Sequence, residues 1–237
     1  MNAPPDRTRT NDQLTLATVG ISALVLSASL WVSAPEAPEP GASAARIRSF
    51  IEANLHQTTL AVIAATIGFG ALILLTVALW RLVAARGDGQ SFAAVTLLIS
   101  GSLSALWLGV AGAVDLIPVV AANDAGKLSS YSDQTLLTLD FTDRLGETFG
   151  DVSTVPRGFF LVCAGLLIVR HRVLPRWTGY LALLVGAASL IGLVVVGLFG
   201  FVLWTLIIGI ASVVMLLAQW KKSRRRGQAP SASKVNM

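Results

Sequence analysis

Two charged residues, Asp115 and Arg157, lie within or at the edge of long apolar stretches and are the first candidates for chemistry. A charge at the centre of a membrane-spanning helix costs about 2.5–3.5 kcal/mol, so each needs a partner or water. At a rise of about 1.5 Å per residue, we place both roughly 6–8 Å below the same membrane surface. The pattern predicts an ion pair that fixes two helices, a solute site or gate in an outward-facing cavity, or side chains that snorkel to the interface.

Other residue patterns offer less chemistry. The sequence contains no HExxH, glycine-rich phosphate loop or GxSxG motif. His56 and His171 are expected on opposite sides of the membrane, so we reject haem ligation inside a helical bundle. Cys163 is the only cysteine in the sequence, which excludes an internal disulfide and a thiolate metal cluster. We predict no metal, no cofactor and no enzymatic activity.

The elements that must position these residues are apolar segments. Hydrophobic residues make up 54% of the chain and charged residues 13%. From Trp177 to Trp220, 44 consecutive residues include no Asp, Glu, Lys, Arg or His, which suits two spans of about 20 residues joined at Gly197–Gly200. The sequence predicts an all-α, polytopic membrane protein, with residues 14–220 forming a bundle of six transmembrane helices at about 14–32, 60–80, 92–120, 150–169, 177–197 and 200–220.

The first apolar run, from Leu14 to Val32, has two interpretations. A signal peptide has a similar layout, because basic residues precede the run and small residues at 32–34 resemble a cleavage site. The apolar core is, however, longer than the usual stretch of about 7–15 residues, and Pro35 would directly follow the cut. We therefore predict an uncleaved first helix.

Charge asymmetry between the connections predicts the orientation. If the N-terminus is inside, cytoplasmic segments hold 13 of the 18 Lys and Arg residues and the outer connections hold 4. This positive-inside bias predicts that the segment 1–13 and the tail 221–237 are both cytoplasmic. We expect the tail to be disordered and to contact anionic lipid headgroups through its basic residues, which are Lys221, Lys222, Arg224, Arg225 and Arg226. The net charge of +5 thus serves topology and lipid contact, and we predict no nucleic-acid binding.

The long connection 121–149 is acidic and contains apolar residues at helical spacing. It predicts a short amphipathic helix lying on the outer membrane surface. Nearby, Pro118 and Pro156 either end their helices or free backbone carbonyls for a ligand.

Span three contains small residues at four-residue spacing, which let another helix approach closely. This stripe indicates packing within the bundle or, alternatively, dimerisation; its members are Gly101, Ala105, Gly109 and Ala113. Ser100, Ser102 and Ser104 on the same span either line a polar path or bond back to their own helix.

The segment Gly158 to Leu193 combines an apolar helix, a short basic turn and a helix rich in small residues. Its turn reads Leu174-Pro175-Arg176-Trp177 and is followed by Gly179. This arrangement resembles the DUF4386 family of bacterial integral membrane proteins. The resemblance implies a multi-pass protein of the bacterial cytoplasmic membrane, and it brings no assigned activity.

Two functions are compatible with these features. The first is a non-enzymatic structural or partner-binding membrane component, whose partners are the bilayer, anionic headgroups and a membrane protein or a second copy of the chain. The alternative is a small transporter or channel for a polar or ionic solute, with Asp115 and Arg157 lining an outward-facing cavity. A transporter requires a polar cavity that reaches the midplane, and the sequence shows no convincing inverted repeat.

Overall fold

The computed structural model describes residues 7–32, 35–124 and 130–227. Much of the predicted N-terminal segment and the end of the tail, 228–237, lie outside the described residues. The prediction of an all-α fold is confirmed, with helices α1 (Arg7–Leu30), α2 (Ala44–Ala84), α3 (Phe92–Asp124), α4 (Asp133–Val152), α5 (Thr154–His171), α6 (Arg176–Leu190) and α7 (Val194–Gly227).

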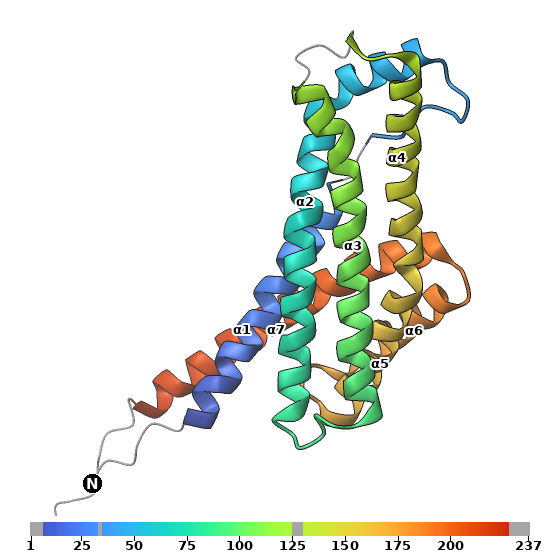
Figure 1. Ribbon diagram of the computed structural model, residues 1–237. Helices are drawn as coiled ribbons and strands as arrows, with labels where there is room; N and C mark the ends of the chain where they lie inside the picture. Colours follow the sequence, from blue (N-terminus) through green and yellow to red (C-terminus); the bar gives the residue numbers. More distant parts are fainter. Residues whose placement is uncertain (1–6, 33–34, 125–129, 228–237) are drawn as a thin grey trace, which may run out of the picture.

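Successive helices run in alternating directions, and α4 and α5 together make one run that is interrupted at Ser153 (Figure 1). The start of α1 and the end of α7 therefore lie at one end of the molecule, together with the α2–α3 and α5–α6 turns. Among the described residues, five helical stretches are long and apolar enough to cross a membrane, which indicates a multi-pass membrane protein: Asn11–Leu30, Ala44–Ala84, Phe92–Asn123, Asp133–His171 and Gly197–Lys221.

The predicted span 177–197 corresponds to α6, which is only 15 residues long and extends about 22 Å. It ends in a turn at residues 191–193, so the prediction of a turn at Gly197–Gly200 is wrong. Gly192 adopts a φ of 85° there, and the amides of Gly192 and Leu193 donate to the carbonyls of Ser189 and Ala188. This is a Schellman motif, which satisfies the backbone at the end of α6.

Gly197 and Gly200 serve close packing instead of a turn. A methyl group at Gly197 would meet Ser189, and one at Gly200 would lie 2.8 Å from the side chain of Val185. Both glycines thus let α7 approach α6. A glycine that makes a turn and a glycine that allows close packing look alike in an apolar sequence, so the sequence does not distinguish Gly192 from Gly197.

Two helices are far longer than a bilayer requires. The 41 residues of α2 and the 33 residues of α3 extend about 60 and 50 Å, against about 30 Å of hydrocarbon. Residues 44–59, which precede the predicted span 60–80, form the beginning of α2. The predicted amphipathic helix in 121–149 is α4, and it stands alongside α3 instead of lying flat. Packing against α3 buries part of its apolar surface, which a flat helix would have to place in the headgroup region.

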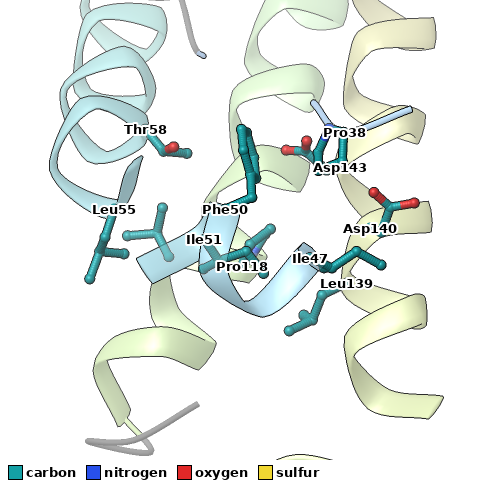
Figure 2. Close-up of a pocket in the computed structure, with 11 residues that line it drawn as sticks. Pro38, Ile47, Phe50, Ile51, Leu55, Thr58, Pro118, Leu139, Asp140 and Asp143 are labelled. Carbon is teal, nitrogen blue, oxygen red and sulfur yellow. The ribbon is translucent and has the colours of Figure 1, made fainter. Parts of the chain in front are cut away.

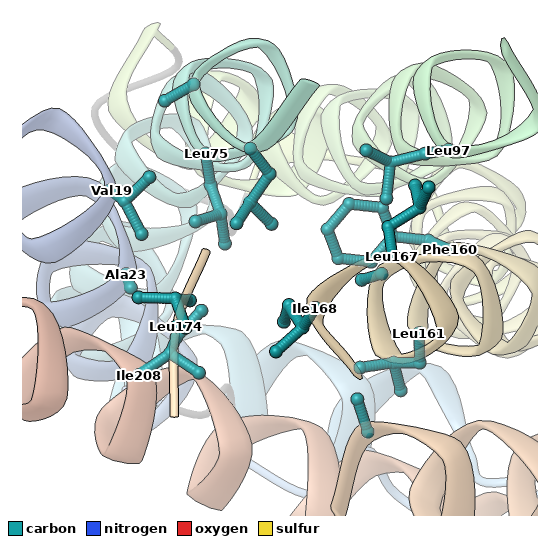
Figure 3. Close-up of a cluster of buried hydrophobic side chains, with 14 of the residues drawn as sticks. Val19, Ala23, Leu75, Leu97, Phe160, Leu161, Leu167, Ile168, Leu174 and Ile208 are labelled. Atoms are coloured by element: carbon teal, nitrogen blue, oxygen red, sulfur yellow. The ribbon is translucent and has the colours of Figure 1, made fainter. Parts of the chain in front are cut away.

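One apolar core joins α1, α2, α3, α5, α6 and α7 (Figure 3). At its centre, Leu75 of α2, Leu97 of α3 and Phe160 of α5 are almost completely buried. Leu174, from the connection between α5 and α6, also enters this core, near Ala23 and Ile208. Dense packing matters here because lipid tails are as apolar as leucine and give helices little hydrophobic reason to associate.

Helices α5 and α6 are in close backbone contact within the core. A Cβ atom at Gly165 would lie 2.6 Å from the carbonyl oxygen of Gly179, and one at Gly186 would lie 2.9 Å from the carbonyl oxygen of Gly158. The two helices therefore meet backbone to backbone at two levels, seven residues apart. Both levels fall within the segment that carries the family resemblance.

Candidate functional site at the distal end

At the end remote from the start of α1 and the end of α7, helices α2, α3 and α4 continue beyond the other helices (Figure 1). We call this part the distal extension and define it as residues 35–59, 112–124 and 130–152. It has a small core of its own, in which Ile47, Leu136 and Leu139 are buried. Ser43 and Ser132 cap α2 and α4, because their hydroxyls accept hydrogen bonds from the amides of Arg46 and Thr135.

A crevice opens between the helices of the distal extension and has a volume of about 410 Å³, counting its open mouth. Figure 2 shows its apolar wall, which comes mainly from α2 and α3, and two carboxylates, which both come from α4. The lining consists of Pro38, Ile47, Phe50, Ile51, Leu55, Thr58, Pro118, Val119, Leu139, Asp140 and Asp143. An apolar wall beside carboxylates suits a group that is apolar with a cationic end.

Two arginines tie the distal extension together. The guanidinium of Arg144 donates to the carbonyl of Pro38 and forms an ion pair with Asp140, with 3.0 Å between Nε and Oδ2. Arg48 of α2 donates to the carbonyl of Tyr131, 3.2 Å away, and the hydroxyl of Tyr131 donates to the carbonyl of Ala121. The segment before α2 and the ends of α3 and α4 are thus held by polar contacts around the crevice.

The face of α4 that points away from the crevice has an exposed apolar stripe. Leu137, Phe141 and Leu145 follow one another at four-residue spacing and are 49%, 64% and 36% exposed. Along the same helix five acidic residues stand against a single basic one, Arg144. An exposed apolar stripe on a strongly acidic helix is typical of a surface that another chain covers.

Asp115 lies within the distal extension and contacts α4. Its carboxylate lies directly against Gly146, where a methyl group would occupy the same space. The side chain is half-buried. Gly146 is therefore the residue of α4 that makes room for this carboxylate.

Arg157 lies deeper, near the start of α5, and is only 6% exposed. It donates a hydrogen bond to the hydroxyl of Ser153, and its guanidinium carbon lies 5.2 Å from the centre of the Phe201 ring. Phe201 in turn stacks on Trp204. The carboxylate whose charge acts on Arg157 is Asp151, six residues earlier in the chain. A desolvated guanidinium over an aromatic ring is a stabilising arrangement.

The structure does not bring Asp115 and Arg157 together, which corrects the predicted ion pair. Asp115 contacts Gly146, and Gly146 precedes Arg157 by 11 residues along the α4–α5 run, about 16 Å at 1.5 Å per residue. The prediction assumed that span three ends and span four begins at the same membrane surface. Because α3 and α4 continue past that level, the two charges lie at different heights along the helix bundle.

Three members of the small-residue stripe on α3 pack inside the chain. A methyl group at Gly101 would collide with Thr76 of α2 and Phe160 of α5, and one at Gly109 would lie 3.1 Å from Phe69 of α2. Ala105 is fully buried, whereas Ala113 is exposed.

The serines of α3 differ in their surroundings. Ser100 donates to the carbonyl of Thr96 on its own helix, Ser102 is exposed, and the buried hydroxyl of Ser104 has no hydrogen-bond partner among the described residues.

At the opposite end, the α2–α3 turn is fastened to α5. The carboxylate of Asp88 lies 2.7 Å from Nε2 of His171 and 3.5 Å from the guanidinium of Arg170. The hydrogen bond from His171 is the main reason that the pKa of Asp88 lies below its usual value. Nothing local in the sequence links residue 88 to residue 171, so this contact is visible only in the folded chain. Within the described residues, no group of three or more His, Cys, Asp or Glu side chains could hold a metal ion.

The basic tail is in part helical. Helix α7 continues to Gly227, so the expectation of a disordered tail from residue 221 onward is wrong for its first residues. Lys221 is exposed. The structure describes only the backbone of Lys222, Arg224, Arg225 and Arg226, and their contact with anionic lipid stays a prediction.

Comparison with known proteins yields one match. The sequence profile of a family described as "Domain of unknown function (DUF4386)" matches residues 14–219. No curated protein and no solved structure matches the chain.

Proposed function

This chain belongs to the DUF4386 family, and on that premise we propose that it is a non-enzymatic protein of the bacterial cytoplasmic membrane that binds a partner through its distal extension. The observation that carries the proposal is the exposed stripe of Leu137, Phe141 and Leu145 on the acidic helix α4. The other apolar side of α4, with Leu136 and Leu139, is already buried inside the chain.

The proposal includes a topology of six crossings with both termini in the cytoplasm. The alternating helix directions support it, because they place the termini and the basic α5–α6 turn at one end. The short helix α6 can serve as a crossing if its turn lies within the outer leaflet. Ile191 at this turn is apolar and 75% exposed, which suits contact with lipid. Lipid does not tolerate unsatisfied backbone groups, and the Schellman motif leaves few of them at the turn.

The charge of α4 favours a particular partner. A second copy docked on the same face would place two strongly acidic helices against each other, which is unfavourable. A basic, amphipathic segment of another protein would cover the apolar stripe and neutralise the acids flanking it. We therefore propose a basic helical segment at the outer membrane surface as the partner, in preference to a homodimer.

The transporter alternative has less support. It requires Asp115 and Arg157 to line one outward-facing cavity, whereas Arg157 is packed under Phe201 and Asp115 lies against Gly146 at a different height. The crevice of the distal extension is lined by neither residue. These contacts favour a structural role for both charges.

The partner proposal is tested by crosslinking in living cells. A photoreactive phenylalanine analogue at Phe141 should form a discrete adduct with another protein. The same analogue at Phe199 is the matched control, because this phenylalanine of α7 is equally exposed but lies outside the distal extension. When membranes are washed with high salt before irradiation, the yield of the adduct at position 141 should fall, because the attraction between the two proteins is partly electrostatic. A single adduct at 141 with the mass of two copies of this chain would contradict the proposed partner.

The topology is tested separately, with cysteine labelling. In a Cys163→Ser background, Ser132→Cys should react with a membrane-impermeant maleimide added to intact cells, and Ser91→Cys should react only after the membrane is opened. Labelling of position 91 in intact cells would overturn the orientation.

A further inference from the structure

At the end where α1 starts and α7 ends, these two helices diverge from α2 and α3 (Figure 1). A crevice lies between α1 and α2, with a volume of about 1090 Å³ counting its open side. Exposed apolar residues form much of its wall, namely Leu14 of α1 and Leu74 and Val77 of α2. We call it the proximal crevice. It is a groove between two helices that is open on one side.

The polar end of the proximal crevice is rich in arginine. Arg81 of α2 lines it together with Asp12 of α1. Asp12 also lines a neighbouring hollow, to which Arg86 and Arg172 contribute from the α2–α3 turn and from the connection between α5 and α6. The two neighbouring hollows that share Asp12 are thus lined by three arginines from two separate parts of the chain. All three arginines are exposed, and the ion pairs found among the described residues do not involve them.

Aromatic residues mark this level of the molecule as a membrane–water interface. Trp80 precedes Arg81 and donates from its indole to the carbonyl of Gly89, 3.0 Å away. Trp177 and Trp220, at the start of α6 and near the end of α7, are both exposed at the same end. Tryptophan is enriched where lipid headgroups begin, so the arginines lie at headgroup depth and the apolar wall lies at acyl-chain depth.

We propose that the proximal crevice binds one phospholipid with a net anionic headgroup. Its phosphate lies among Arg81, Arg86 and Arg172, and one acyl chain lies along Leu14, Leu74 and Val77. Arginine is well suited to phosphate oxygens because its guanidinium offers several donors in one plane. The excess of three cations over one carboxylate favours a net negative headgroup over a zwitterionic one. Lys221, the one residue of the basic tail whose side chain the structure describes, lines neither hollow.

Native mass spectrometry of the full-length protein in detergent tests the proposal. Dioleoyl phosphatidylglycerol is titrated into the wild type, into Arg81→Gln, and into the double variant Arg81→Gln/Arg86→Gln. The dissociation constant of the first bound lipid should rise about fivefold for each arginine removed, from about 1 kcal/mol per basic residue near the surface. Arg176→Gln is the matched control, because this exposed arginine at the same end lines neither hollow, and it should leave the affinity unchanged.

Two results would overturn the site. One is an equal loss of affinity in Arg176→Gln and Arg81→Gln, which would indicate attraction to the basic surface in general. The other is equal affinity of the wild type for dioleoyl phosphatidylethanolamine and phosphatidylglycerol, which would remove the selectivity for a negative headgroup. Size-exclusion chromatography and circular dichroism of each variant verify that the fold is intact. Val77→Trp changes no charge, and its larger side chain should displace the acyl chain and also weaken lipid binding.

Discussion

The embedded core and the distal extension are built from the same kind of helix but are held together differently. In the core, α5 and α6 meet backbone to backbone at glycines, and the guanidinium of Arg157 lies over the ring of Phe201. In the distal extension the helices are linked by the polar contacts of Arg48 and Arg144 around a small apolar cluster. A helix surrounded by lipid gains by close packing, whereas a helix in water gains by burying a limited apolar face.

The contrast predicts that an added methyl group has very different effects in the two regions. Gly165→Ala should lower the free energy of unfolding by about 3 kcal/mol, because the new methyl meets the Gly179 carbonyl, which cannot move without separating the helices. Unfolding in detergent measures the effect. Gly70→Ala is the control, since no atom lies within 4 Å of a methyl there, and it should be neutral or slightly stabilising. Equal behaviour of the two variants would contradict backbone contact between α5 and α6.

The buried arginine provides a second test of the core. In a double-mutant cycle, Arg157→Met and Phe201→Leu should show a coupling of about 2 kcal/mol, the magnitude of a desolvated cation–π contact. The same cycle with Phe199→Leu should show no coupling, because Phe199 is exposed and precedes Phe201 by two residues on α7. Coupling of equal size in both cycles would point to a general effect on α7.

In the distal extension a methyl group should be tolerated better. Gly146→Ala should cost about 1 kcal/mol, because the obstructing group is the Asp115 carboxylate, which can rotate away. Gly150→Ala on the same helix has open space and should stabilise the protein slightly. Adding Asp115→Ala to Gly146→Ala should recover the loss. If it does not, the carboxylate is not what Gly146 accommodates.

The smallest expected effect concerns the turn between α2 and α3. The folded state lowers the pKa of Asp88, so the ionised carboxylate stabilises the fold. This stabilisation is fully present above the pKa of an unfolded aspartate, about 3.9, and is lost as the pH falls through the lowered pKa of the folded state. Asp88→Asn should therefore reduce the melting temperature at neutral pH and have no effect in strong acid. His171→Ala should likewise make the melting temperature depend less on pH. A constant difference between Asp88→Asn and wild type at all pH values would mean that the charge is not involved.

The comparison also explains which predictions failed. The predicted starts of two apolar segments, residues 92 and 177, agree with the starts of α3 at Phe92 and α6 at Arg176. Helix length was underestimated where polar residues precede an apolar run, because the first parts of α2 and α4 are stabilised by packing against each other. That extra length placed Asp115 and Arg157 at different heights along the helix bundle.

The glycines show a similar limit. The stripe on α3, which contains Gly101 and Gly109, was recognised from its spacing of four residues. The glycine pairs of α5 and α6 have a spacing of seven residues, Gly158 with Gly165 and Gly179 with Gly186, and this signal was present in the sequence but was not used. Gly192, which makes the turn, cannot be told from Gly197 by its neighbours, since both stand in uninterrupted apolar sequence.

The sequence by itself determined that this chain is helical and built for a membrane, because the cost of placing charges in hydrocarbon limits where spans can lie and on which side arginines gather. Only the tertiary structure decided how far each helix continues past its apolar run, which glycines turn and which pack, and what surrounds Asp115 and Arg157. Those properties depend on contacts between residues far apart in the chain, such as Gly146 with Asp115 and Arg157 with Phe201, and no local pattern encodes them.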